Sequence, residues 1–178
     1  MVGSSSAEPG PLNEVRPLLV WFVVGSVIAV AFVFDSPAMD FRLVALGAVL
    51  PVVEGVAGGP WVLHTPITGV ALLGGVMVVA RGRRLLQRRW LAVPIGQLAH
   101  LVMDGTWSDT EVFWWPFFGL DTLGGSRVPE FGRLGTGLLL ESVGLILGAW
   151  AWRRFGLNDP SARRALWADG RLTFRRRV

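Results

Sequence analysis

The sequence contains no cysteine, no tyrosine and no lysine, and it has few charged residues of either sign. Without cysteine, the chain cannot form a disulfide, a thiolate metal site or a thiol nucleophile. Without tyrosine, aromatic anchoring falls to nine Trp and ten Phe residues. Charged residues make up 17% of the 178 residues, whereas a soluble domain typically has roughly 25%. The low charge therefore argues against a chain surrounded by water.

Hydrophobic residues, by contrast, make up 52% of the chain and give it a mean hydropathy of +0.50. They are grouped in five long blocks, at residues 18–34, 41–57, 61–80, 90–104 and 134–152. Blocks of this kind are typical of membrane segments. We predict an all-α fold, namely a polytopic transmembrane helix bundle of about five segments. The second block contains Pro51 and Glu54, so it is either a kinked span or a re-entrant element.

Composition also divides the chain into regions. Residues 1–16 are small, polar and rich in Pro and Gly, which predicts a disordered N-terminal tail. Residues 17–156 form the predicted transmembrane helical domain, which includes an outer loop at 105–133 rich in aromatic residues. Residues 157–178 are a basic tail.

All 17 basic residues are arginine, and their distribution predicts an orientation. With five segments, one side of the membrane receives fourteen of them and the other receives only Arg16, Arg127 and Arg133. Positive residues concentrate on the cytoplasmic side, so the C-terminus is predicted to be cytoplasmic. A re-entrant second block would move only the N-terminus to the inside. The arginines adjoin apolar blocks, so the net charge of +4 is not taken to indicate a nucleic-acid partner.

Five ionisable residues lie within or beside the apolar blocks at one predicted level, the outer half of the membrane: Glu54, His64, His100, Asp104 and Glu141. Such groups are costly in hydrocarbon unless they are paired or hydrated, and they commonly mark functional sites. His100 and Asp104 are four residues apart, which places both on one helix face, with Gln97 one turn earlier. This pair either binds a metal ion through nitrogen and oxygen or forms a hydrogen-bonded pair in the bundle core.

Two further features each have two interpretations. Glu141 lies on a stripe with Gly137, Gly144 and Gly148 that allows close helix approach, so it either bonds to a neighbouring helix or faces a polar cavity. The aromatic run at 113–118 is typical of a belt at the membrane interface. The alternative is a lid over the polar cluster, with Asp109 and Glu111 at its rim.

Four motifs follow one another along the chain: G-A-V-L-P-V-V-E-G at 47–55, L-H-T-P at 63–66, H-L-V-M-D at 100–104 and F-W-W-P-F at 113–117. Their order resembles the YdjM-like family of bacterial inner-membrane proteins, described as membrane-bound metal-dependent hydrolases. The resemblance covers about residues 43–118 and implies Glu54, His64, His100 and Asp104 as metal ligands. It departs from the family pattern in having His64 alone where that family usually has two histidines. Its acidic residue is Glu54 rather than an Asp directly after the Pro.

The sequence therefore predicts a multi-pass protein of the inner membrane with a metal-dependent hydrolase site at the outer interface. His64, His100, Asp104 and Glu54 would hold a divalent ion, with Zn²⁺ the most suitable, and Glu54 or Glu141 would be catalytic. Membrane lipid is the expected partner, and a lipid-linked ester or phosphoester is the expected substrate.

Two other hypotheses remain. The first is a non-catalytic membrane scaffold or partner-binding protein whose polar cluster fixes helix packing. The second is a proton or ion pathway, which the confinement of the polar residues to one half of the membrane disfavours. No G-x-S-x-G, Walker or dinucleotide-binding motif is present.

Overall fold

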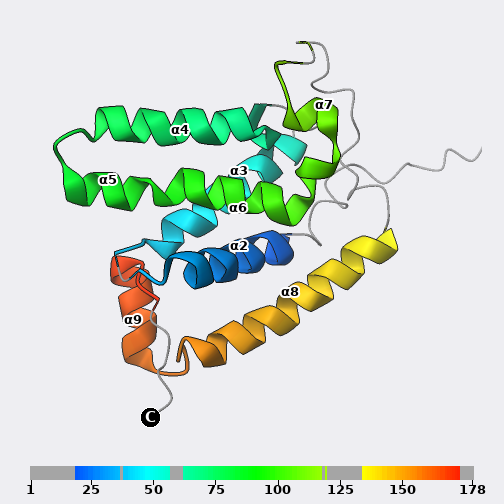
Figure 1. The fold of residues 1–178 in the computed structure, drawn as a ribbon. Helices are drawn as coiled ribbons and strands as arrows, with labels where there is room; N and C mark the ends of the chain where they lie inside the picture. Colours follow the sequence, from blue (N-terminus) through cyan, green and yellow to red (C-terminus); the bar gives the residue numbers. More distant parts are fainter. Residues whose placement is uncertain (1–18, 37, 57–61, 118, 120–133, 173–178) are drawn as a thin grey trace, which may run out of the picture.

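The computed structural model describes residues 19–36, 38–56, 62–117, 119 and 134–172 (Figure 1). Over these residues the protein is all-α and has no strand, which confirms the predicted class. In chain order the elements are α2 (Leu19–Phe34), α3 (Phe41–Val56), the 3-10 helix η2 (Val62–His64), α4 (Pro66–Val79), α5 (Arg84–Trp90), α6 (Ala92–Asp104), the 3-10 helix η3 (Thr106–Ser108), α7 (Thr110–Phe113), α8 (Leu134–Arg154) and α9 (Pro160–Asp169).

The five predicted apolar blocks correspond to α2, α3, α4, α6 and α8. The second block is one continuous helix with Pro51 inside it. The arginine-rich stretch between the third and fourth blocks forms α5, and part of the basic tail forms α9. The predicted tail at 1–16, loop residues 120–133 and the last six residues lie outside the described part of the chain.

Among the described residues, no helix is both long enough and apolar enough to cross a bilayer. Four of the five helices that correspond to the apolar blocks contain only 13 to 16 residues, whereas a crossing helix needs about 20.

Helices α3 and α6 form the most extensive helix pair, and their backbones approach closely. A side-chain carbon added at Gly47 would collide with the carbonyl group of Val93, and one added at Gly96 would collide with that of Val44. Glycine on both helices is therefore what allows this distance. The contact places the last two turns of α6 beside the second half of α3.

The other helices pack around this pair (Figure 1). Helix α4 lies alongside α5 and α6, and α2 contacts α3, α6 and α8. Gly144 of α8 faces the backbone of Trp21 so closely that an added Cβ atom would lie 2.8 Å from it. Part of the stripe of small residues predicted from the sequence is thus a helix contact.

Helix α9 is attached to the N-terminus of α3 by a polar network around the buried Asp40. The Asp40 carboxylate accepts hydrogen bonds from Arg42 Nη2 at 2.9 Å and Arg89 Nε at 3.1 Å. Burial alone would raise the pKa of Asp40, but the hydrogen bonds and charge of Arg42, together with the charge of Arg89, hold it below its ordinary value of 3.8. Arg42 also donates to two carbonyl groups at the end of α9, and Gly170 O accepts from Phe41 N at 2.8 Å.

We predict that Gly96→Ala destabilises the protein by about 1–3 kcal/mol, because its methyl group has no room at the α3–α6 contact. Gly74→Ala is the matched control, since Gly74 lies on α4 with nothing within 4 Å of an added Cβ. The control should gain about 0.5–1 kcal/mol through helix propensity. Thermal unfolding followed by circular dichroism measures both, and equal effects of the two substitutions would contradict the packing argument.

Candidate metal site

Three ligand-type side chains from two segments meet inside the bundle. His64 ends η2, whereas His100 and Asp104 lie one turn apart at the end of α6. Their exposed fractions are 3%, 1% and 8%. The α3–α6 contact and the hydrogen bonds from Leu63 and His64 to Glu54 bring them together although they are up to 40 positions apart in sequence.

The geometry of these three residues suits a metal ion. Each offers one ligand atom, and the three atoms all lie within 4.8 Å of one another. His64 Nε2 is 4.0 Å from Asp104 Oδ2, and the two imidazole rings are 5.8 Å apart at an interplanar angle of 79°. Because each metal–ligand bond is about 2 Å long, two ligands of one ion are at most about 4 Å apart, so these side chains need to move only a short distance closer to share an ion. The buried His64–His100–Asp104 cluster could therefore hold a metal ion.

Glu54 lies behind His64, on the side away from Asp104. Its carboxylate is 3.0 Å from His64 Nδ1 and accepts hydrogen bonds from the backbone N–H groups of Leu63 at 2.9 Å and His64 at 3.2 Å. Because an ionised carboxylate only accepts, the proton of the His64 ring belongs on Nδ1, which leaves Nε2 free as a ligand. Carboxylates commonly orient metal-binding histidines in this way. The structure thus places Glu54 next to a ligand rather than within the three-residue cluster.

Unpaired polar atoms collect at the same place. Among the described residues, His100 Nδ1, Asp104 Oδ1 and Gln97 Oε1 are buried and have no hydrogen-bond partner. The other Asp104 oxygen accepts from Thr106 Oγ1 at 2.7 Å, and Gln97 Nε2 donates to Leu63 O at 2.8 Å. A buried polar atom without a partner costs about 1–3 kcal/mol, so three together call for an explanation. A cation bound by His100 and Asp104 would supply the kind of partner that these side chains lack.

Apolar packing surrounds the His100 ring and fixes its position. Phe22 of α2 lies against it, with ring centroids 4.1 Å apart and an interplanar angle of 36°. The ring also lies close to the backbone of Ala48 on α3. Its Nδ1 is buried and has no hydrogen-bond partner among the described residues.

Glu141 is not part of this cluster. Its two carboxylate oxygens accept hydrogen bonds from Val20 N at 3.2 Å and Trp21 N at 3.1 Å. These N–H groups belong to the first turn of α2, where an acidic group is favoured by the helix dipole and by donors that have no partner within the helix. Of the two interpretations of Glu141, the structure shows the bond to a neighbouring helix.

Two contacts at the cluster were absent from the sequence analysis. Thr106 follows Asp104 by two positions, and Gly105 between them has a φ of +74°, which turns the chain back toward the carboxylate. The D-G-T sequence could have suggested this local bond. Phe22 could not have been found, because it is one apolar residue among many in its block.

The aromatic loop is described only in part. Asp109 accepts hydrogen bonds from Glu111 N and Val112 N and so caps α7. Trp107, Trp114 and Phe117 are exposed. Neither the aromatic belt nor the lid over the cluster is tested by these contacts.

Comparisons of the chain with protein-family models, with curated proteins and with solved structures find no match. The resemblance to the YdjM-like family therefore stays a prediction, and the site is argued from its own geometry.

The carboxylates of the buried Glu54 and the half-buried Glu141 are predicted to respond differently to neutralisation. Glu54→Gln should weaken Zn²⁺ binding roughly 10- to 100-fold, because His64 loses the partner that orients it. Glu141→Gln should leave Zn²⁺ affinity within about twofold while destabilising α2 by about 1 kcal/mol. Competition with a chromophoric chelator measures affinity, and thermal unfolding measures stability. A similar loss of Zn²⁺ affinity in both variants would disprove this separation.

Proposed function

We propose that the protein is a metal-dependent hydrolase whose divalent ion is held by His64, His100 and Asp104. The observation that carries the proposal is the convergence of three buried ligand groups within 4.8 Å, where His100 Nδ1 and Asp104 Oδ1 have no other partner among the described residues.

The donor set favours catalysis over a purely structural site. Two imidazole nitrogens and one carboxylate are typical of catalytic Zn²⁺ sites, which keep a fourth position open, whereas structural sites are closed by four ligands. When bound, such an ion acts as a Lewis acid and lowers the pKa of a coordinated water to about 7. Zn²⁺ also suits this mixture of nitrogen and oxygen donors.

The surrounding residues have separate tasks in this proposal. Glu54 holds His64 in the tautomer that presents Nε2. Thr106 occupies one oxygen of Asp104 and leaves the other free. The unpaired Gln97 Oε1 is placed to accept a hydrogen bond from water or from a substrate hydroxyl group. Both carboxylates that the sequence suggested as catalytic are occupied by other donors, Glu54 on the side of His64 away from Asp104 and Glu141 at α2, so neither is assigned as the general base.

A membrane location is part of the same proposal. Several polar side chains of the described helices are fully buried, among them Ser26, Gln97 and His100, while apolar side chains such as Val78 and Val79 of α4 are 74% and 84% exposed. Extensive exposed apolar surface commonly marks contact with membranes or other proteins. We propose that this exterior contacts lipid and that the substrate is a lipid-linked ester or phosphoester.

One observation favours the alternative of a non-catalytic scaffold. The hydrogen bonds of Glu54 and Gln97 tie residues Leu63 and His64 to α3 and α6, so the same cluster fixes helix packing. A scaffold needs these bonds but no ion.

We predict that the purified protein binds about one Zn²⁺ per chain and that His100→Ala and Asp104→Asn abolish this binding, since each removes one of three ligands. Asp109→Asn is the matched control, because Asp109 caps α7 and is not one of the clustered ligands. Elemental analysis after dialysis gives the metal content. Hydrolysis of chromogenic esters and phosphoesters should fall on the order of 100-fold in the two ligand variants and after chelation.

Metal content that is low and equal in wild type and all variants would overturn the metal site. Thermal stability that falls in His100→Ala and does not respond to added Zn²⁺ in the wild type would support the scaffold instead.

The membrane location predicts that the full chain, expressed in bacteria, stays in the membrane pellet after alkaline carbonate extraction, because its apolar exterior is held by lipid. A green fluorescent protein fused to the C-terminus should fluoresce, as expected for a cytoplasmic C-terminus. Recovery of the folded chain in the carbonate supernatant would contradict the membrane location, and a dark but full-length fusion would contradict the orientation.

A further inference from the structure

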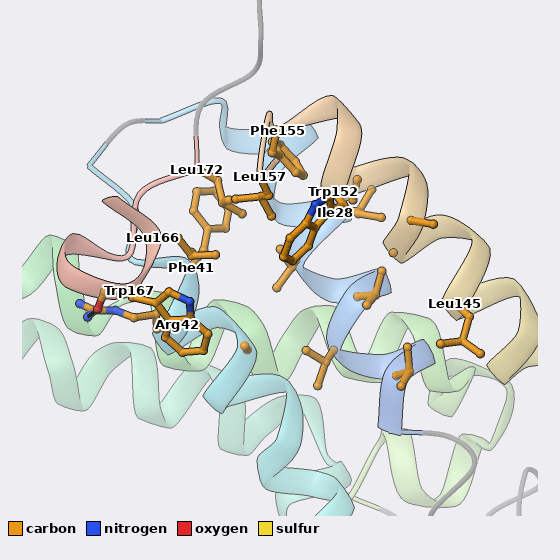
Figure 2. A pocket seen from close by; sticks show the side chains of 18 residues that line it. Ile28, Phe41, Arg42, Leu145, Trp152, Phe155, Leu157, Leu166, Trp167 and Leu172 are labelled. Carbon is orange, nitrogen blue, oxygen red and sulfur yellow. Dashed lines mark hydrogen bonds between the residues drawn. The ribbon is translucent and has the colours of Figure 1, made fainter. Parts of the chain in front are cut away.

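A second candidate binding region lies away from the metal cluster, where α8 and α9 meet α2 and α3. An apolar groove of about 610 Å³ runs between these four helices (Figure 2). Valine side chains of α2, Leu145 and Ala149 of α8, and Leu166 of α9 line it. Its volume is within the roughly 300–1,000 Å³ range of small-molecule sites.

A basic pocket of about 280 Å³ adjoins the groove. Both hollows are lined by Arg42, and the consecutive residues Trp167 and Ala168 of α9 line one each. The basic pocket is lined by four arginines and two aspartates: Arg42, Arg88, Arg89, Arg171, Asp40 and Asp169. An apolar groove therefore leads directly into a pocket with an excess of positive charge.

Two of these arginines are available to a ligand. Arg42 and Arg89 are bound to the Asp40 carboxylate. In the described part of the chain, the exposed side chains of Arg88 and Arg171 make no hydrogen bond or ion pair, although they line the same pocket. Arginine suits phosphate because its fork of donors can bind two oxygens at once.

We propose that this region binds one anionic phospholipid, with an acyl chain in the apolar groove and the headgroup phosphate on Arg88 and Arg171. The apolar groove matches the acyl chain of such a lipid, and the basic pocket matches its phosphate. The groove and the pocket meet at Arg42, just as the acyl chain and the headgroup belong to one molecule. A zwitterionic lipid would bring a cation of its own beside the arginines, and a free phosphate would leave the groove unfilled.

This lipid is distinct from the proposed substrate. Asp40 precedes α3 and Glu54 is near its end, so the basic pocket and the metal cluster are separated by most of a 16-residue helix, about 20 Å at 1.5 Å per residue. The lipid would instead fill the space beside α8 and strengthen its packing against α2 and α9. The lipid site can therefore be tested independently of the hydrolase proposal.

The experiment uses the full chain, purified in detergent and stripped of lipid. Phosphatidylglycerol and phosphatidylcholine with the same acyl chains are added in turn, and binding is followed by native mass spectrometry and by the change in Tm. We expect phosphatidylglycerol to bind and raise the Tm. The double variant Arg88→Ala/Arg171→Ala should weaken its binding on the order of 10- to 30-fold, from the loss of two phosphate-facing charges.

Matched variants test each half of the site. Arg81→Ala/Arg153→Ala removes two exposed arginines that lie outside the pocket, and it should leave binding unchanged. Arg88→Lys/Arg171→Lys keeps the charge and should retain most of the binding. Ala149→Trp narrows the groove and should weaken binding, whereas Ala71→Trp on the exposed surface of α4 should not.

Equal binding of the two lipids, or equal losses in the two arginine double alanine variants, would overturn the anionic lipid site. Soluble glycerol phosphate tests whether the pocket binds a phosphate group without the acyl chains of a lipid. If it binds as tightly as phosphatidylglycerol and Ala149→Trp has no effect, the pocket is a site for free phosphate and the lipid assignment is wrong.

Discussion

The close backbone contact of α3 with α6 is the constraint on which the rest of the structure depends. Gly47 and Gly96 bring each helix against the carbonyl groups of the other, and a single methyl group at either position has no room. This contact sets His100 against the backbone of Ala48 and brings the end of α6 beside Leu63 and His64 of η2. The candidate metal site is therefore a consequence of helix packing, and its ligands are held by segments that cannot move apart without breaking the core.

Polar groups in this bundle are organised by the partners available to them, as the carboxylates show. Glu54 accepts from two backbone N–H groups and faces the His64 ring, Glu141 accepts from the first turn of α2, and Asp40 binds two arginines. Asp104 differs, since among described atoms one of its oxygens has no partner. A buried carboxylate that is fully satisfied stabilises packing, whereas one with an unpaired oxygen beside two histidines is suited to bind a cation.

The two candidate sites occupy different regions of the bundle and have different chemistry. At the end of α6, nitrogen and oxygen ligands face inward and are buried. Near the start of α3, arginines gather around Asp40 beside an apolar groove. The buried metal cluster is suited to a small ion, and the arginine-lined region is suited to an amphiphile with a negative headgroup.

The apolar blocks predicted the helices well. The block at 134–152 corresponds to α8 (Leu134–Arg154), and the block at 90–104 corresponds to α6 (Ala92–Asp104). These helices were predictable because a run of apolar residues bounded by Pro, Gly or Asp is a local property of the sequence. The His100–Asp104 pair was also predictable, since four-residue spacing on a helix places both side chains on one face. The sequence could not show that Glu54 lies beside His64 whereas Glu141 of α8 binds the start of α2. For both residues it predicted only a depth along a helix axis, which does not say which neighbour the side chain contacts. Which helix a side chain faces depends on rotation and contact between helices, and glycines far from either residue in sequence set these through the space they leave.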